Sequence, residues 1–475
     1  MHCKLPPGPA GLPILGSLLQ LGPRVHESLF HMANRHGPLM TLRLGTVTTV
    51  VASSPEAARE LLGKNDAALS YRSVPDAIAA QPNPEFTLGW VPGDIEWRSR
   101  RRFCTNHLFS ANRLDALRHI RHQKVRQLIS HIDRKYRNTG KPVDIGKMVF
   151  YTNLNVISNA LFSGDLVDAD FERFQEFKDV VSRIMVDSGK LNVSDYLPWL
   201  QPLDLQGIRR LVRCSYERLH EIFDVIIDKR LRDRAAEKSS SSIAQDNEDF
   251  LDALLRQCQE KGSGFDPQNI KALLVELFVA GSDTTSITIE WTMAELLRKP
   301  DVLQKARQEL LTVVGTERPV EESDIDKLPY LQAIAKETMR LRPAGPLLLP
   351  YKVKTDFEVF GYTLPRGTQV LVNAWAIGRD PNYWTEPMDF RPHRFMEASN
   401  IDYKGCNFEY IPFGSGRRTC PGMPLAVRMV PLTVASLIQA FSWRLPGGTS
   451  PEELNMEEKF GVTLKKAVPL LAMAT

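Results

Sequence analysis

One cysteine of this sequence lies in a setting that suits metal binding. Cys420 ends the segment Phe413–Cys420 and is followed by Pro421 and Gly422. Glycines in this segment let the backbone turn tightly beneath a flat ligand, and a helix that begins at Pro421 directs its free N–H groups and the positive end of its dipole at the sulfur. This arrangement favours the thiolate, which is the form of cysteine that binds a metal. A lone free cysteine is, however, most often a small buried apolar residue.

An acid and an alcohol stand side by side on a long amphipathic helix that we predict over residues 268–298. Ala280 and Thr284 are four residues apart and share one face, and the small side chain at 280 leaves room for a planar cofactor. Gly281 weakens the helix and a threonine hydroxyl can bond back to the preceding turn, so we expect a notch here. Asp283 and Thr284 could relay protons through that notch. For an isolated Asp-Thr-Thr segment, an ordinary helix surface is the simpler interpretation.

Two further pairs of side chains have helical spacing. Glu337 and Arg340 are three residues apart on one predicted helix and can form an ion pair. Trp97 and Arg101 are four residues apart and share a face of another. The other arginines of that second helix would point outward and form a basic patch, which is either solvated or docks a partner. These arginines are Arg98, Arg100 and Arg102.

The elements that must position these residues are mainly helical. Apolar residues recur at three- and four-residue spacing over most of residues 55–341. Near the start, two alternating apolar runs joined by Gly45 and Thr46 predict a β-hairpin of Leu39–Leu44 with Thr48–Val51. We therefore expect a mainly α protein with small β-sheets.

The second half of the chain has fewer regular elements. A serine cluster within residues 234–248 predicts a solvated loop. Short extended segments are predicted at residues 357–360 and 369–373, and an irregular proline-rich stretch follows at residues 380–412. A last long helix is predicted from about Pro421 to Phe441.

Composition limits the function classes. The 475 residues can bury a large core and enclose a cofactor, and 43% apolar with 24% charged residues is typical of a soluble globular protein. The net charge of +4 is small for this length, and the charges alternate in sign, so nucleic-acid binding is not supported. Six scattered cysteines without a C-x-x-C pair indicate a reducing compartment. No window reaches the roughly 18 consecutive apolar residues of a membrane span.

Together these motifs resemble those of the cytochrome P450 superfamily. Its haem-loop pattern, F-x-x-G-x-R-x-C-x-G, is matched at all five fixed positions. The segments A-G-x-D-T-T at 280–285, E-x-x-R at 337–340 and W-x-x-x-R at 97–101 are similar to the family's oxygen-activation, scaffold and haem-propionate motifs, in the family's order. With the proline segment Leu5–Pro9 they span nearly the whole chain.

The resemblance implies the cytochrome P450 fold, an α+β single large domain that encloses haem b with the thiolate of Cys420 as axial ligand. It implies activation of O2 with electrons from NADPH, delivered by NADPH–cytochrome P450 reductase, and proton delivery by Asp283 and Thr284. Arg394 would complete a buried structural triad with Glu337 and Arg340. The residues expected to bind the haem are Trp97, Arg101, Ala280, Phe413, Gly416, Arg418 and Gly422.

The resemblance also places the chain among the microsomal members of the family. Residues 1–9 would be a proline-rich hinge after a missing membrane anchor, removed by truncation, and residues 10–475 would be the haem-thiolate monooxygenase domain. We therefore expect association with the endoplasmic reticulum membrane, on its cytosolic face.

A substrate class follows from segments that look like those of plant terpenoid hydroxylases, such as geraniol hydroxylases and ferruginol synthase. The segments are Leu328–Ala333, Tyr410–Gly414 and Phe460–Thr463. An apolar wall around the haem desolvates a hydrocarbon well and offers few partners to a charged molecule. We expect hydroxylation of a terpenoid, with an abietane-type diterpene ahead of a monoterpene alcohol. The residues expected to contact this small apolar substrate are Phe86, Leu88, Val279, Leu347, Leu348 and Val462.

Two alternative functions stay open at this point. A haem-thiolate isomerase or dehydratase would need neither O2 nor a reductase, although such relatives typically lack the acid and alcohol pair. A non-catalytic haem-binding sensor would need no proton relay. Two positions depart from the family's pattern: His393 stands where many members carry Glu, and Tyr351 stands where many carry a basic residue near a haem propionate.

Overall fold

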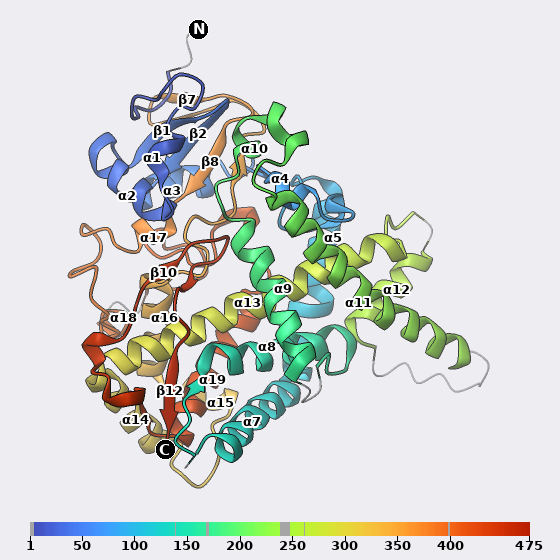
Figure 1. Cartoon of the computed structure of the whole chain (residues 1–475), viewed down its shortest axis with the longest axis vertical. Helices are drawn as coiled ribbons and strands as arrows, with labels where there is room; N and C mark the ends of the chain where they lie inside the picture. The colour runs from blue at the N-terminus through green and yellow to red at the C-terminus, as the bar shows by residue number, and fades with distance from the viewer. Residues whose placement is uncertain (1–3, 138, 168–170, 238–247, 261, 398–399) are drawn as a thin grey trace.

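The computed structural model describes the whole chain except residues 1–3, 138, 168–170, 238–247, 261 and 398–399 (Figure 1). Long helices make up most of the molecule, and a small sheet lies near the N-terminal end. The prediction of a mainly α protein with small β-sheets is confirmed. The serine cluster at 239–242 lies outside the described residues, and helix α11 extends through Glu237, further than the predicted loop at 234–248 allowed.

The helices of the first half include several short 3-10 and π turns, labelled η. They are α1 (Leu18–Leu21), α2 (Val25–His36), α3 (Pro55–Ala58), η1 (Arg59–Lys64), α4 (Asp76–Ala79), η2 (Pro84–Phe86), α5 (Ile95–Cys104), η3 (Thr105–Phe109), α6 (Ala111–Ala116), α7 (Arg118–Lys135), α8 (Ile145–Phe162), α9 (Phe171–Asp187), α10 (Val193–Tyr196), η4 (Pro198–Leu203) and α11 (Ile208–Glu237).

The helices of the second half carry most of the predicted motifs. They are α12 (Phe250–Gln259), α13 (Pro267–Arg298), α14 (Pro300–Val313), α15 (Glu322–Ile325), α16 (Pro329–Leu341), α17 (Ala374–Ile377), α18 (Arg394–Glu397), η6 (Gly416–Arg418), α19 (Met423–Ala440), η7 (Pro446–Gly448) and η8 (Pro451–Glu453).

The largest sheet has the strand order β1-β2-β8-β5-β3 and lies at the N-terminal end of the molecule (Figure 1). The predicted hairpin is present, since Leu44 pairs with Val47 across a turn in which Gly45 has φ 56°. The strands are β1 (Leu39–Leu44), β2 (Val47–Ala52), β3 (Tyr71–Arg72), β4 (Val143–Asp144), β5 (Tyr351–Lys352), β6 (Phe357–Val359), β7 (Tyr362–Leu364), β8 (Gln369–Val372), β9 (Trp443–Arg444), β10 (Glu458–Lys459), β11 (Lys465–Lys466) and β12 (Leu471–Ala474).

Helix α13 runs through the centre of the fold and packs against α8, α11, α16 and α19 (Figure 1). Asp266 caps its first turn and Pro267 occupies its first position, as the sequence favours. Apolar residues surround the helix on nearly all sides, which is typical of a helix buried in the core. By composition α13 and α19 are apolar enough to cross a membrane, but 72% and 61% of their most apolar windows are buried inside the fold.

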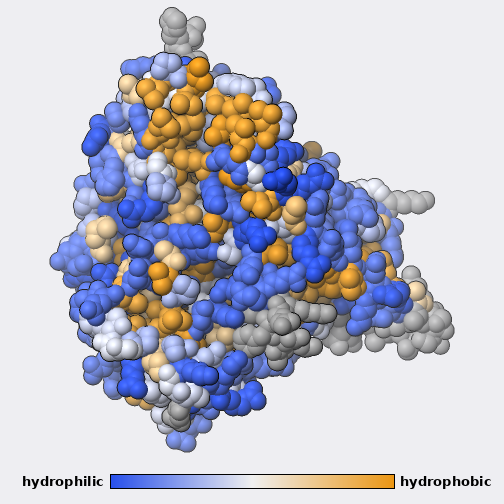
Figure 2. Space-filling view, viewed as in Figure 1, coloured by the Kyte–Doolittle hydropathy of each residue, from blue (hydrophilic) through white to orange (hydrophobic). Residues whose placement is uncertain are grey.

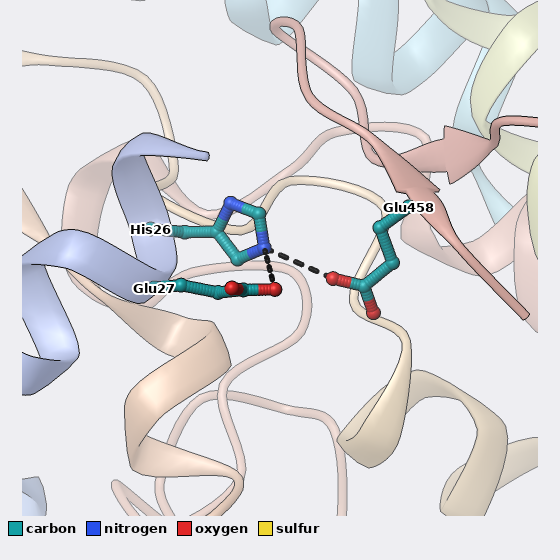
Figure 3. A group of neighbouring side chains, drawn as sticks. All are labelled: His26, Glu27 and Glu458. Atoms are coloured by element: carbon teal, nitrogen blue, oxygen red, sulfur yellow. Dashed lines mark hydrogen bonds and ion pairs between the residues drawn. The ribbon is translucent and has the colours of Figure 1, made fainter. Parts of the chain in front are cut away.

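A buried ion network ties the N-terminal part of the chain to the C-terminal part. His26 of α2 is fully buried, and its Nε2 lies 2.9 Å from Oε2 of Glu458 on β10 (Figure 3). Arg342 donates to Glu458 at 2.5 Å and to Glu295 of α13 at 2.9 Å. Glu27 lies beside His26 at 4.0 Å, but Arg342 already neutralises Glu458, so these acids form an ion-pair network rather than a cation site.

The network predicts that Glu458→Gln destabilises the protein. Burial would raise the pKa of Glu458, but the His26 hydrogen bond and the charges of Arg342 and Arg379 outweigh burial and lower it to about 2. Removing one partner of such a buried pair costs about 3–5 kcal/mol. Urea unfolding followed by circular dichroism at neutral pH should show this loss.

Because the folded pKa is depressed, the stabilisation by Glu458 is present above the unfolded carboxyl pKa of about 4 and is lost as pH falls from there towards 2. Glu457→Gln, which changes an exposed neighbour, is the matched control. Equal urea midpoints for the two variants at neutral pH would contradict a stabilising role for the network.

Candidate active site

A cavity of about 340 Å³ lies between the middle of α13 and the segment that carries Cys420. Ala280 and Thr284 line it from one side and Cys420 lines it from the other. Ala280 and Cys420 both have exposed surface although they lie deep inside the fold, because that surface faces the cavity. The two main motifs of the sequence therefore meet across one cavity.

The Cys420 loop needs its glycines. Gly414 and Gly416 have φ of 72° and 68°, and a β-carbon on Gly416 would lie 2.4 Å from the carbonyl oxygen of Leu62. Both positions therefore require glycine. The loop closes on itself, since the N–H of Cys420 donates to the carbonyl of Phe413 at 3.0 Å. Phe413 and Gly422 also line the cavity.

Helix α19 begins at Met423, two residues later than predicted, because residues 421 and 422 form a turn. The N–H groups of Gly422 and Met423 still bond to the sulfur of Cys420. Burial raises the pKa of the Cys420 thiol, and these two N–H groups together with the charge of Arg101 oppose the rise. Donors aimed at the sulfur favour the thiolate, as the sequence predicted.

Trp97, Arg101 and Arg418 lie at one edge of the cavity. The Trp97 indole N–H donates to the carbonyl of Leu88 at 2.9 Å, and the Arg418 guanidinium lies 4.2 Å from the centre of the indole system. Arg418 also donates to backbone carbonyls, among them Leu88 at 3.1 Å, and Arg101 donates to the carbonyl of Thr419 at 2.5 Å. The three predicted residues are therefore close together.

Arg72 is a fourth residue of this edge, and no motif pointed to it. It lines the cavity and its guanidinium lies 4.2 Å from the ring centre of Tyr351, its partner in the β3–β5 pairing. Position 351 carries Tyr where many members of the family carry a basic residue, and here Arg72 on the neighbouring strand places a basic group beside it. At the other departure, His393 contacts Lys305 across a 2.6 Å N···N distance.

The arginines at the edge of the cavity carry positive charge that nearby carboxylates do not neutralise. Burial lowers the pKa of Arg418 to about 9, and repulsion from Arg72 and Arg101 adds to this effect. Backbone carbonyls are their main partners, and Glu276 is the only carboxylate among the described residues that line the cavity. Buried guanidinium groups in this arrangement fit a bound group that carries negative charge.

Glu276 is a second residue that the motifs did not indicate. It stands one turn before Ala280 on the same face of α13, and its carboxylate accepts hydrogen bonds from the N–H groups of Leu88 and Gly89 at 2.5 and 2.8 Å. A β-carbon on Gly89 would lie 2.8 Å from the carboxylate, so glycine permits the close approach. Burial raises the pKa of Glu276, opposed by those two hydrogen bonds.

Helix α13 is regular where a notch was expected. The Thr284 hydroxyl donates to the carbonyl of Ala280 at 2.7 Å within an unbroken helix. A β-carbon on Gly281 would lie 2.8 Å from Cδ1 of Ile157 on α8, so this glycine serves close helix packing rather than local opening. The expectation of a notch was wrong, because the neighbouring helix fixes the backbone. Asp283 does not line the cavity, and its carboxylate is buried behind it.

Glu337, Arg340 and Arg394 lie together, away from the cavity. The buried side chains of Glu337 and Arg340 form a bidentate ion pair with N···O distances of 2.7 and 2.8 Å. Nε of Arg394 lies 3.1 Å from the same carboxylate, and Arg340 also donates to the carbonyls of Pro387 and Asp389. The group attaches α16 to the segment that leads towards the Cys420 loop.

Four of the six predicted substrate contacts line the cavity, and two do not. Leu88, Val279, Leu348 and Val462 line the cavity. Leu347 instead lines an adjoining cavity of about 290 Å³, whose walls also include Leu348 and Val462. Phe86 lines neither space, because its ring packs against Phe265 with centres 5.2 Å apart. Residues without a motif complete the apolar wall: Ile157, Ile184, Met185, Tyr216 and Leu277.

The outward basic patch on α5 is smaller than expected. Arg98 and Arg102 are exposed, but Arg100 is buried. Arg100 donates to the carbonyl of Glu85 at 2.7 Å and lies 4.6 Å from the ring centre of Phe86. The expectation for Arg100 was wrong because the segment around Phe86 folds back over this side of the helix.

The family model for "Cytochrome P450" matches residues 6–471 of the chain. The chain belongs to the cytochrome P450 family. Among its relatives, geraniol 8-hydroxylase of Catharanthus roseus is 47% identical over 99% of this chain and 94% of its own length, and that of Swertia mussotii is 46% identical over the same shares. Drimenol monooxygenase of Persicaria hydropiper is 43% identical over 99% of this chain and 92% of its own length.

Membership of the cytochrome P450 family makes the chain a monooxygenase that uses haem with a cysteine thiolate ligand and O2. The residues of the cavity fit this group. A cysteine sulfur with N–H donors faces the small side chain of Ala280, and arginines gather at one edge, where the two carboxylates of haem b need partners. Bound haem supplies the chemistry that activates O2, and the chain supplies its surroundings.

Proposed function

We propose that this P450 hydroxylates a terpenoid, with Cys420 as the thiolate ligand of the haem. The observation that carries the proposal is that Cys420 faces Ala280 and Thr284 across a mainly apolar cavity, within a chain that matches the family nearly from end to end. Gly416 would shape the loop that holds the haem, and Phe413 and Gly422, which line the cavity, would contact the haem. Asp283 and Thr284 would supply the protons that O2 activation needs.

The edge of the haem would be held by Trp97, Arg101 and Arg418, and we add Arg72 to this set. Each of these four residues has an N–H donor at the edge of the cavity, where the buried arginines favour a bound group with negative charge. The triad of Glu337, Arg340 and Arg394 would act by holding the scaffold of the Cys420 loop rather than by chemistry.

Electrons would come from NADPH through NADPH–cytochrome P450 reductase. The exposed arginines Arg98 and Arg102 lie on α5, the helix that also carries Trp97 and Arg101. An acidic flavoprotein domain is attracted to such a surface, and attraction between opposite charges raises the association rate.

The substrate would be a terpenoid held by the apolar walls, with Leu88, Val279, Leu348 and Val462 in contact with it. The relatives named for geraniol and drimenol support this class. An abietane-type diterpene stays our prediction from sequence, but the names of these relatives favour an alcohol. Glu276 offers one point of attachment for an alcohol, because its carboxylate has lone pairs beyond the two that bond to the backbone.

The proposed location is the cytosolic face of the endoplasmic reticulum membrane. Exposed apolar side chains gather at the end of the molecule that holds the N-terminal sheet and α10 (Figure 2). These side chains come from two segments, at residues 12–19 and 199–205, and the turn at residues 45–46 bonds to chain next to or within both. The N–H of Gly45 donates to the carbonyl of Leu15, and the N–H of Thr46 donates to the carbonyl of Tyr196. Such a patch fits insertion into the lipid boundary. Its residues are Leu12, Ile14, Leu19, Trp199, Leu203 and Leu205.

The ligand assignment predicts that Cys420→Ser abolishes both the thiolate-type Soret band of the reduced CO complex and hydroxylation. The helical circular dichroism should persist, because the glycines of the loop and the start of α19 remain. Cys406→Ser, which changes an exposed cysteine elsewhere, is the control. Undiminished reductase-dependent hydroxylation by Cys420→Ser would show that another residue binds the iron.

The substrate class predicts a low-to-high-spin shift and product with terpenoids. A spectral titration should compare an abietane diterpene hydrocarbon, geraniol, a flavonoid and a fatty acid, followed by turnover with reductase, NADPH and O2. A shift and product only with the flavonoid or the fatty acid would overturn the terpenoid class. Rearranged product formed without O2 and reductase would favour an isomerase instead, and binding without any product would favour a sensor.

The apolar patch predicts binding to phospholipid vesicles even without a preceding anchor. Vesicle flotation should show that Leu203→Ser with Leu205→Ser weakens the partition coefficient by about tenfold or more, because two exposed leucines no longer enter the lipid. Val225→Ser removes an equally exposed apolar residue from α11 and should have no effect. Equal losses in both variants would argue against this patch as the membrane contact.

A further inference from the structure

Asp283 reaches the cavity through Thr463, a residue to which the sequence motifs assigned no role in proton transfer. The Thr463 hydroxyl donates to Oδ2 of Asp283 at 2.8 Å, and both side chains are buried. Thr463 lines the cavity, whereas Asp283 does not. The Thr284 hydroxyl is already engaged with the carbonyl of Ala280. Thr463 therefore joins the Asp283 carboxylate directly to the cavity, in addition to Thr284 on the cavity wall.

We propose that Thr463 is a member of the proton relay and that its hydroxyl connects Asp283 to the cavity. The proposal rests on the proposed role of Asp283 as proton source and extends it. A hydroxyl can accept one hydrogen bond while it donates another. When Asp283 is protonated, Thr463 Oγ1 takes that proton and releases its own towards the cavity, so one proton enters, one leaves, and Thr463 stays neutral.

The segment that carries Thr463 is fixed on both sides. The N–H of Val462 donates to the carbonyl of Met185 at 2.8 Å, and the N–H of Leu464 donates to the carbonyl of Ala344 at 2.9 Å. The indole N–H of Trp291 donates to the carbonyl of Leu464 at 3.0 Å. Thr463 is therefore held in place before any proton moves, which lowers the entropic cost of the transfer geometry.

Two basic side chains, Lys178 and Lys465, act on Asp283, and neither of them lines the cavity. Burial raises the pKa of Asp283, while the charges of Lys465 and Lys178 and the Thr463 hydrogen bond oppose the rise. Lys465 donates to the Ser182 hydroxyl on α9, and the charges of Lys459 and Glu290 also act on it. Lys178 and Lys465 are only partly buried, so a path that returns protons from solvent to Asp283 would begin at these two side chains.

Thr463→Val tests the link, because it removes the hydroxyl at nearly constant volume. Product formed per NADPH should fall about tenfold, with the missing electrons recovered as peroxide, since one general-acid step loses its donor. Thr463→Ser keeps the hydroxyl and should retain coupling. Thr433→Val, at a buried threonine of α19 whose hydroxyl has no hydrogen-bond partner, controls for the loss of a buried hydroxyl.

A second measurement needs no turnover. Infrared difference spectra of the ferric protein, with the Asp283 carboxyl band assigned by its loss in Asp283→Asn, give the pH midpoint of that group. The Thr463 hydrogen bond lowers the pKa of Asp283, so Thr463→Val should raise the midpoint and Thr463→Ser should leave it unchanged. Unchanged coupling or an unchanged midpoint in Thr463→Val would overturn the proposal. A wild-type protein without the thiolate-type CO spectrum would instead overturn the proposed function.

Discussion

Arg72, Arg101 and Arg418 bring three guanidinium groups to one edge of the cavity beside Cys420. Burying a charge costs several kcal/mol unless other groups replace its water, and here backbone carbonyls do so. The carbonyls belong to four separate stretches of chain, around Ser70, Leu88, Leu349 and Thr419. The hydrogen bonds from the arginines to these carbonyls therefore hold the four stretches close together. They also fix the edge of the cavity at which a dianionic cofactor would be held.

The Leu88–Gly89 dipeptide connects that edge to helix α13. Its carbonyls accept hydrogen bonds from Trp97, Arg418 and Arg72, and its N–H groups bond to the carboxylate of Glu276 on α13. Positive charge on one side and negative charge on the other thus act on the same two peptide groups. A shift of this dipeptide would change the cationic edge, the cavity wall and the position of α13 together.

Sequence patterns predicted the residues whose partners are near in the chain. The hairpin, the long helix at 268–298 and the Glu337–Arg340 pair depend on local spacing, and the structure contains each of them. Arg72 and Glu276 were missed because their partners lie far away in the sequence, and a lone arginine or glutamate has no local signal. The notch in α13 was predicted wrongly for the same reason. Gly281 packs against Ile157 of another helix, and this contact has no signal in the local sequence.

Burial of charged side chains was the other limit on prediction from sequence. Arg98, Arg100 and Arg102 look alike in the sequence, yet Arg100 is covered by the segment that contains Phe86. Periodicity gives the face of a helix on which a residue lies, but not what covers that face. The fold class and the motif positions could therefore be predicted, whereas the complete wall of the cavity required the structure.

The segment from Glu458 to Lys465 contains both a residue of the buried ion network and residues of the cavity wall. Glu458 anchors one end in the buried network with His26 and Arg342, Val462 forms part of the cavity wall, and Thr463 bonds to Asp283. These contacts lie within a few residues of one another, so the ion network limits how far the cavity wall and the acid can move. A rigid anchor of this kind would serve the proposed proton relay, because proton transfer depends on distances that must hold before the reaction begins. Charge pairing remote from the cavity thereby contributes to the geometry inside it.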